Sequence, residues 1–417
     1  MKIDQMTQKI QKVVATQNQR QVSFTGDLLK LLRLRNNYTQ EKLSQGICSI
    51  SYMSKMENNQ MPTNTYVLRE VAKVFDTDVE NFTYLNDGET IVSKLAKGFY
   101  YEDHPLLNDI AVHLKPFGEN PITLLQQIIC KLLSRDYGEI ESAIEEIQPL
   151  IKSTPTDYTK LYGVVTAVYF YHTTRYHEAL NILLNIENIQ TEIGEIITLE
   201  QIYLYLVSER VGHHSASVNY YTKAKQCLSQ HPHKKYAIKL PLFNAYFTTI
   251  KGPELGRNMI KKMSLNQLEK HHQNIFILTY LRSHIHEKDK HYNARYFAKL
   301  NHETKDEAYY QCLLIYEKYC AKYGLKLPFP MPDSGAIEER HLGAIHYIVD
   351  KMAESASKHR YLKKVALPKA IEEQDLFYID YFTKEINRYA LDNHRYKEVF
   401  MANQKQKKAI ENIQAVI

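Results

Sequence analysis

The stretch Thr39–Asn58, TQEKLSQGICSISYMSKMEN, has the pattern of two short helices joined by a tight turn. Thr39 is well suited to cap the first helix. Gly46 stands where a short turn between crossed helices needs a residue without a Cβ atom. In the helix that follows, Met53 and Met56 recur at helical spacing, so both are expected to face inward. This arrangement is typical of a helix that enters the major groove of DNA.

The outward face of this second helix is short, polar and cationic, as a surface close to phosphates and base edges must be. Basic side chains are expected to supply salt-dependent attraction to phosphates. Hydroxyl and amide side chains are expected to set the register of the helix on the DNA. The alternative is an ordinary helical hairpin with a solvated face. The predicted DNA-binding residues are Lys30, Arg33, Thr39, Gln40, Lys42, Ser49, Ser51, Tyr52, Lys55 and Asn58.

The flanking segments are expected to complete a small helical bundle. Upstream, Phe24–Arg35 carries leucines at helical spacing, and downstream Thr65–Phe75 has a second apolar face. Asp78–Phe82 is expected to close the bundle. The residues predicted to be buried in these two helices are Leu28, Leu31, Leu32, Tyr66, Leu68, Val71 and either Val74 or Phe75.

Composition restricts the class of protein. The formal net charge of +6, from 53 basic and 47 acidic side chains, permits nucleic-acid binding without requiring it. The five cysteines lack C-x-x-C spacing, which favours free thiols in a reducing cytosol over disulfides or a zinc site. No apolar run approaches the length of a membrane span, and the first twenty residues lack the apolar core of a signal peptide. A cytoplasmic protein without membrane contact is therefore expected.

From about residue 105 onward the chain repeats a helix, a tight turn and a helix. The clearest unit is Tyr158–Ile186, with its turn at Thr173–Tyr176, and Leu199–Leu228 follows with a turn at Gly212. Such pairs bury a continuous core only by stacking, and the stack curves around a concave groove. The predicted domains are an N-terminal extension (1–23), a helix-turn-helix domain (24–84), a helical linker (85–104) and a tetratricopeptide-like repeat domain (105–417).

The residues of the opening stretch carry a resemblance to a known family. The run TQEKLSQGICSISYMSKMEN resembles the Xre/Cro class of helix-turn-helix, and the wording G-I-C-S-x-S-x-M-S-K-M-E is similar to its peptide-pheromone-regulated branch, the RNPP family. The resemblance is specific over residues 24–84 and extends further only as an architecture of helical repeats. It implies an all-α protein, with an Xre/Cro-type bundle followed by a tetratricopeptide-like α-solenoid.

Receptors of this family use Asn and Tyr side chains of the repeat helices to hold a short signalling peptide, and this chain has suitable residues. Arg210 and Arg282 are expected to be able to pair with a peptide carboxylate. The alternatives are a capping or solvated role for each Asn, a core role for each Tyr and a surface ion pair for each Arg. The candidate peptide-binding residues are Tyr171, Tyr205, Arg210, Asn244, Asn274 and Arg282.

The resemblance implies a quorum-sensing transcription regulator that binds operator DNA and is controlled by a short peptide. A single helix-turn-helix covers little DNA, so a homodimer on a palindromic operator is expected. Two alternatives remain open: a protein-interaction regulator that binds a phosphorelay response regulator, and a phage or plasmid lysogeny or transfer control protein. The sequence has no H-E-x-x-H, G-x-G-x-x-G, phosphate-binding loop or G-x-S-x-G motif, so no enzyme, cofactor or metal site is expected.

Overall fold

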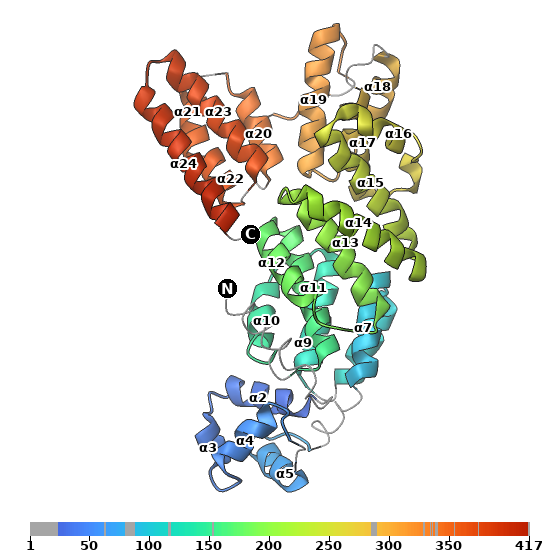
Figure 1. The fold of residues 1–417 in the computed structure, drawn as a ribbon, viewed down its shortest axis with the longest axis vertical. Helices are drawn as coiled ribbons and strands as arrows, with labels where there is room; N and C mark the ends of the chain where they lie inside the picture. The colour runs from blue at the N-terminus through green and yellow to red at the C-terminus, as the bar shows by residue number, and fades with distance from the viewer. Residues whose placement is uncertain are drawn as a thin grey trace. The chain divides into compact units, whose positions relative to one another are not determined.

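A computed structural model describes residues 24–415 except 62–63, 80–87, 116–117, 152–153, 285–289, 328–329, 334, 336, 338–340, 354 and 374. Every regular element in this described part is helical, which confirms the predicted all-α class (Figure 1). The chain forms two compact units. The first holds the described residues up to Ser208 together with His213–His231, and the second holds Glu209–Gly212 and the described residues from Pro232 onward.

The first four helices form a small bundle, called the head below. They are α2 (Thr25–Arg35), α3 (Gln40–Ser44), α4 (Ile50–Glu57) and α5 (Thr65–Val74). Met53 and Met56 of α4 are both 0% exposed, as predicted from their spacing. The hydroxyl of Thr39 caps α3 by accepting from the Lys42 backbone N–H at 3.0 Å. Gly46 lies in the turn with a φ of +76°, a conformation that an L side chain would strain.

The inward face of α5 differs from the prediction. Tyr66 was expected to be buried but is 59% exposed, and of the two alternatives Val74 and Phe75, Val74 is 42% exposed and Phe75 is half-buried. The helix instead buries Val67 and Ala72 beside Leu68 and Val71, so a different side of its apolar surface faces the core of the head. Of the predicted closing segment Asp78–Phe82, residues 80–82 lie outside the described part.

The rest of the first unit consists of helices that pack in successive pairs. Their bounds are α7 (Gly88–Tyr101), α8 (His104–Leu114), α9 (Pro121–Ser134), α10 (Ile140–Ile147), α11 (Thr156–His172), α12 (Tyr176–Ile186), α13 (Gly194–Arg210) and α14 (His214–Gln230). α7 packs on α8, α9 on α10, and α11 on α12. The α11–α12 pair matches the predicted Tyr158–Ile186 unit and its turn. α7, predicted as a linker helix, also packs against α9 and α11, so its apolar side chains belong to this core.

The second unit continues the pattern of paired helices. It contains α15 (Lys234–Lys251), α16 (Pro253–Ile260), the short η4 (Leu265–Gln267), α17 (Lys270–His284), α18 (Lys290–Phe297) and α19 (Glu307–Tyr323). Gly324 ends α19 with a φ of +63°, as its position after the helix predicts. The last elements are α20 (Leu342–Lys351), α21 (Ser355–Tyr361), a π-helical turn η6 (Leu362–Ala366), α22 (Leu367–Glu372), α23 (Leu376–Asp392) and α24 (Tyr396–Ala415).

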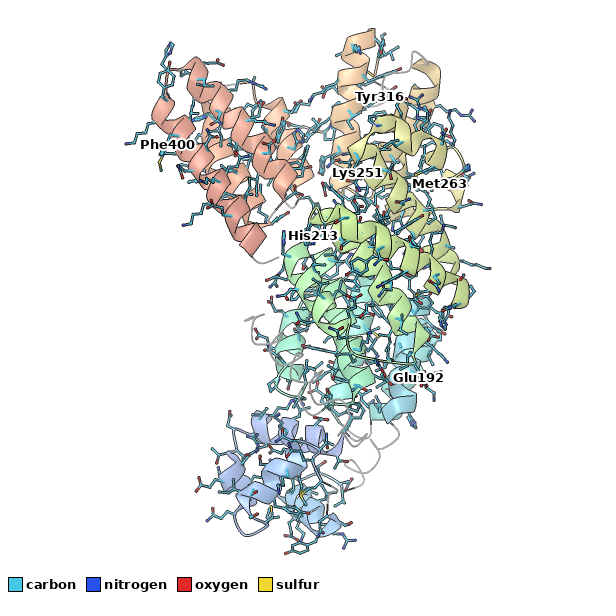
Figure 2. All side chains as sticks on the ribbon, viewed as in Figure 1. Glu192, His213, Lys251, Met263, Tyr316 and Phe400 are labelled. Carbon is cyan, nitrogen blue, oxygen red and sulfur yellow. The ribbon has the colours of Figure 1, made fainter. Side chains whose placement is uncertain are left out.

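The end of the second unit has its own core. Tyr378, Phe382 and Ile386 of α23 are at most 1% exposed and pack with apolar side chains of η6, α22 and α24. Phe400 of α24, labelled in Figure 2, is 60% exposed. α23 and α24 pack together as the last helix pair of this unit. Within the described ranges, no helix has both the length and the apolar composition that crossing a bilayer requires.

Candidate functional site

The outer face of α4 carries the exposed polar residues that the sequence placed there. Ser51 and Lys55 are exposed, and Tyr52 is half-buried. The Ser49 hydroxyl caps α4, since it accepts from the Tyr52 backbone N–H at 3.2 Å. At the other end, the amide Nδ2 of Asn58 donates to the Ser54 carbonyl at 2.7 Å, so Asn58 terminates the helix. Ser51 and Lys55 are thus exposed polar residues on the outward face of α4.

α3 adds a smaller polar edge beside the turn. Thr39 is exposed, but its hydroxyl already caps the helix. Lys42 is exposed, with its ammonium 4.1 Å from the centroid of the Tyr38 ring. This cation–π contact restrains the lysine stem while leaving its charge at the surface. Lys42 therefore remains in the predicted DNA-binding set.

Two other predicted DNA-binding residues are engaged inside the head. The Arg33 guanidinium makes a two-point contact with Glu57, with Nε at 2.5 Å from Oε1 and Nη2 at 3.0 Å from Oε2. Gln40 donates to the same carboxylate at 2.7 Å. Glu57 is 0% exposed and joins α2, α3 and α4. Arg33 and Gln40 are therefore better explained as ties within the head than as DNA contacts.

The end of α4 is also tied to the start of α2. The Gly26 backbone N–H donates to Asn59 Oδ1 at 2.9 Å, and Asn59 Nδ2 donates to Asp27 Oδ2 at 3.0 Å. A Cβ atom on Gly26 would lie 2.1 Å from the Met56 carbonyl oxygen, so only glycine allows this approach. Sequence reasoning missed Glu57 and Asn59. The sequence feature that could have indicated them is a carboxylate and an amide two residues apart at the end of the predicted helix.

Basic residues of α2 attach the head to the following part of the first unit. The Lys30 ammonium donates to the Pro149 carbonyl at 2.7 Å. Arg35 pairs with Glu119 at 2.8 Å and with Glu146, and the hydrogen bond to Glu146 is the main reason that the pKa of Arg35 is raised. Lys30, predicted to contact DNA, thus has a partner within the chain.

In the second unit, polar side chains from the end of α13 and from α15, α17 and α19 meet in what we call the arginine cluster: Arg210, Tyr246, Arg282, Glu307 and Gln311. Arg282 lies over the Tyr246 ring, 5.1 Å from its centroid, and donates to Gln311 Oε1 at 2.6 Å. Arg210 lies 3.9 Å from the Glu307 carboxylate. Gln311 in turn donates to Glu307 at 2.8 Å. The structure therefore brings together the two predicted carboxylate-binding arginines.

The arginine cluster has unused donor capacity. Arg282 Nη1 is buried and has no hydrogen-bond partner among the described residues. A buried guanidinium donor without an acceptor is costly, so a carboxylate or carbonyl oxygen at this point would be favourable. On the acidic side, burial raises the pKa of the nearby Asp375 to about 6, and the charge of Glu307 adds to this effect.

The other candidate peptide-binding residues lie in different environments. Asn274 is 0% exposed, and its Nδ2 donates to the backbone carbonyls of Asn301 and Thr304 at 3.2 and 2.8 Å. Tyr205 is 1% exposed. Both side chains therefore support the core, and we leave them out of the proposed peptide site. Asn244 and Tyr171 are half-buried and remain candidates.

The five cysteines carry free thiols. Among the residues that the structure describes, no three His, Cys, Asp or Glu side chains are grouped so that they could hold a metal ion.

Comparison with known proteins rests on structure, since no family model and no curated protein matches the chain. The apo form of the quorum sensor NprR from B. thuringiensis is similar with a TM-score of 0.58 at 13% sequence identity, over 80% of this chain and 100% of that chain. PlcR from Bacillus thuringiensis, in complex with the peptide PapR7 and DNA, has a TM-score of 0.32 at 14% identity, over 72% and 98% of the two chains. The likeness to NprR shows that this chain shares its all-helical fold.

Proposed function

We propose that the protein is a transcription regulator that binds operator DNA through the head and is controlled by a short peptide bound in the repeat helices. The observation that carries the proposal is the geometry of α3 and α4. Two capped helices meet at a left-handed glycine, Met53 and Met56 anchor α4, and Ser51 and Lys55 face outward. This is the arrangement in which a helix-turn-helix presents its second helix to the major groove.

The arginine cluster supports the second part of the proposal. Arg282 has a buried donor to offer, and Arg210 adds positive charge beside the Tyr246 and Phe247 rings. A free peptide carboxylate provides the planar pair of acceptors that guanidinium groups bind best. NprR, which shares this fold, is a quorum sensor, and this supports a sensing role for the protein. The peptide would shift DNA affinity only to the extent that it binds two conformations of the protein unequally.

One head covers only a short stretch of DNA, so we propose that a homodimer reads a palindromic operator. Light scattering of the full chain with a selected DNA duplex would give the stoichiometry. Two chains per duplex is the expected result, and one chain per duplex at saturation would contradict it.

The double substitution Ser51→Ala and Lys55→Ala is expected to weaken binding to a duplex selected from a random-sequence pool about tenfold or more. The serine hydroxyl and the lysine ammonium are the outward polar groups of α4, and each DNA contact of this kind contributes of the order of 1 kcal/mol. Lys55→Ala alone should also reduce the slope of log K against log salt by about 1. Fluorescence anisotropy at several salt concentrations measures both effects.

The matched control is Lys270→Ala, which removes the same charge from an exposed position in the second unit. It should leave the affinity and the salt slope unchanged. Wild-type affinity in the double variant, with unchanged circular dichroism, would show that α4 does not read DNA.

Arg282→Gln is expected to weaken the binding of peptides with a free carboxyl end about tenfold or more, because a charge-assisted hydrogen bond contributes roughly 1.5–3 kcal/mol. The probe is a pool of random heptapeptides, in one preparation with free and in another with amidated carboxyl ends. Native mass spectrometry identifies the bound peptides, and calorimetry gives their affinities. The control is Arg360→Gln on the exposed side of α21. Equal affinity of free and amidated peptides would exclude a carboxylate at Arg282.

A further inference from the structure

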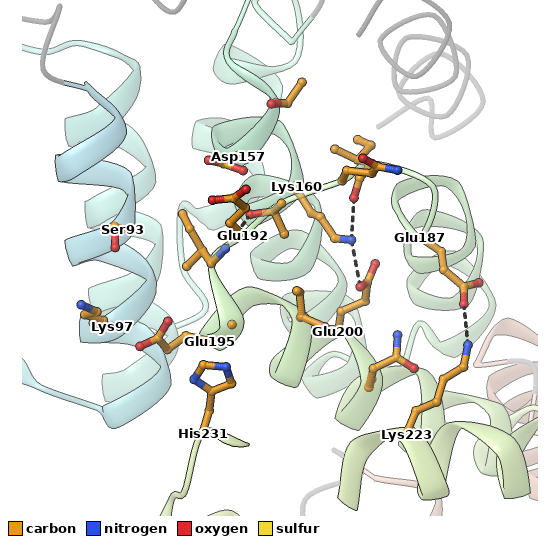
Figure 3. A pocket seen from close by; sticks show the side chains of 18 of the residues that line it. Ser93, Lys97, Asp157, Lys160, Glu187, Glu192, Glu195, Glu200, Lys223 and His231 are labelled. Carbon is orange, nitrogen blue, oxygen red and sulfur yellow. Dashed lines mark hydrogen bonds and ion pairs between the residues drawn. The ribbon is translucent and has the colours of Figure 1, made fainter. Parts of the chain in front are cut away.

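The first unit contains a cavity of about 1310 Å³, whose lining residues belong neither to the head nor to the arginine cluster (Figure 3). Its wall is formed by α7, α11, α13, α14 and the loop between α12 and α13. Sequence reasoning assigned no role to these wall residues. The volume exceeds that of most small-molecule sites, so the cavity has room for more than an ion.

A buried ion pair forms one part of the wall. The ammonium of Lys160, on α11, lies 3.0 Å from Glu200 Oε2, on α13, and the two side chains are 5% and 2% exposed. Lys160 also donates to the Ile189 carbonyl of the loop at 2.7 Å. Figure 3 shows the Lys160 side chain between this loop and Glu200. The lysine thus divides its donors between two acceptors and binds only one oxygen of the carboxylate.

The remaining oxygens of this wall require a donor. Glu200 Oε1 and Gln201 Oε1 are both buried, and neither has a hydrogen-bond partner among the residues described. The two residues follow one another on α13, are 1% and 6% exposed, and both line the cavity. A buried acceptor without a partner is unfavourable, and two adjacent acceptors suit a group that carries several N–H donors on one nitrogen. A primary ammonium is the compact organic group of this kind.

The other charges of the wall restrict the ligand further. Carboxylates and lysines line the rest of the cavity together: Asp157, Glu187, Glu192 and Glu195, with Lys94, Lys97 and Lys223. A polyamine would be repelled by the lysines, and a polyanion would be repelled by the carboxylates. A molecule with one ammonium and one carboxylate is attracted by both sets.

We propose that this cavity binds the free amino end of an amino acid or short peptide, with its ammonium held by Glu200 and Gln201 and its carboxylate beside Lys94 and Lys97. The proposal does not depend on DNA binding or on the arginine cluster. A free amino acid would make the protein a sensor of nutrients, and a short peptide would be held in this cavity by its amino end.

The protonation of Glu200 gives the binding a characteristic pH dependence. Burial raises the pKa of Glu200 to about 7, although Lys160 acts in the opposite direction. Protonated Glu200 carries no charge to attract an ammonium, so affinity should fall as the pH decreases below 7. The other titratable groups that face Glu200 are Lys160 on α11, Glu187 after α12, and Tyr220, Lys223 and Cys227 on α14.

The test uses thermal denaturation and calorimetry of the full-length protein. The probes are the twenty L-amino acids one at a time, a pool of random tripeptides with free amino ends, the same pool acetylated at the amino end, and spermidine. We expect a rise in Tm with an amino acid or with the free tripeptides, and none with the acetylated pool. Which of the first two probes binds identifies the source of the ammonium.

Variants then locate the site. Glu200→Gln and Gln201→Leu, tested separately, should each lower the affinity for the bound probe about tenfold or more. Glu200→Gln should also remove the pH dependence of the affinity near pH 7. The matched control is Glu373→Gln in the second unit, a largely buried carboxylate that also pairs with a lysine and has a pKa raised to about 6 by burial. It should leave the affinity unchanged.

The comparison of probes uses the wild-type protein, so a folding defect in a variant cannot hide the result. Equal binding of acetylated and free peptides would overturn the proposal. So would a response to spermidine alone, or no response to any amine-bearing probe. Loss of DNA binding in the α4 variants has no bearing on these outcomes, which keeps the two proposals distinguishable.

Discussion

Replacing Glu57 with alanine is expected to destabilise the head by about 3–5 kcal/mol, the usual effect of removing one partner of a buried ion pair. Glu57 is 0% exposed, and its partner Arg33 has a side chain that is only 11% exposed. Without the carboxylate, the arginine charge stays in the head, where, among the residues that the structure describes, the Tyr38 carbonyl at 2.9 Å is its remaining acceptor. Gln40 loses its acceptor at the same time.

Hydrogen exchange measured by mass spectrometry on the full chain would resolve this effect. Amides of α2, α3 and α4 should exchange about a hundredfold faster or more, because each 1.4 kcal/mol changes an opening equilibrium tenfold. Amides of α17 in the second unit should be unaffected. Binding to the selected duplex should also be lost, since α4 is no longer held against α2 and α3.

The control for this variant is Glu70→Ala. Glu70 pairs with Lys73 at 2.7 Å on the surface of α5, where the lysine side chain is 72% exposed. Surface pairs of this kind contribute at most about 1 kcal/mol. If both variants had equally small effects on exchange in the head, Glu57 would not be the residue that joins its helices.

The buried Glu200 is expected to make the stability of the first unit depend on pH. Its pKa of about 7 in the folded protein lies above the ordinary value of 4.5. A group with a raised folded pKa binds more protons in the native state, so its contribution to stability is complete below pH 4.5 and is lost as the pH rises through 7. The loss amounts to about 3 kcal/mol across this window.

Comparison of the wild type with Glu200→Gln isolates this contribution. Hydrogen exchange of α11 and α13, measured from pH 5 to pH 8 and corrected for the intrinsic rate, gives the opening free energy of each protein. The opening free energy of the glutamine variant, relative to that of the wild type, should increase by about 3 kcal/mol as the pH rises. Two profiles that stay parallel over this range would show that Glu200 does not titrate near 7.

Much of the fold could be predicted from local sequence. Thr39 and Ser49 cap their helices, Gly46 makes the turn, and Gly324 ends α19, because each depends on the backbone within a few positions. The inward position of Met53 followed from helical spacing alone. The turn between α11 and α12 was likewise predicted from its neighbours in the chain.

The candidate sites were harder to predict from the sequence, because a polar residue on a helix gives no indication of what faces it. Arg33 and Gln40 looked like DNA contacts, but Glu57 lies opposite both of them. Asn274 has the type of side chain expected to contact a peptide, but it instead holds the loop that precedes α19. Each partner comes from a distant part of the sequence, so only the packing of the helices places it.

The amino-acid sequence by itself determined that this protein is all-helical, where α3 begins, and which turn joins α3 to α4. Capping, glycine conformation and apolar spacing act over a few residues, so they can be predicted from residues that are close together in the sequence. Only the tertiary structure decided which basic residues stay at the surface, that Arg210 and Arg282 meet, and that Lys160 and Glu200 share a cavity wall. Those outcomes depend on the register between packed helices, which side-chain packing sets across long sequence separations.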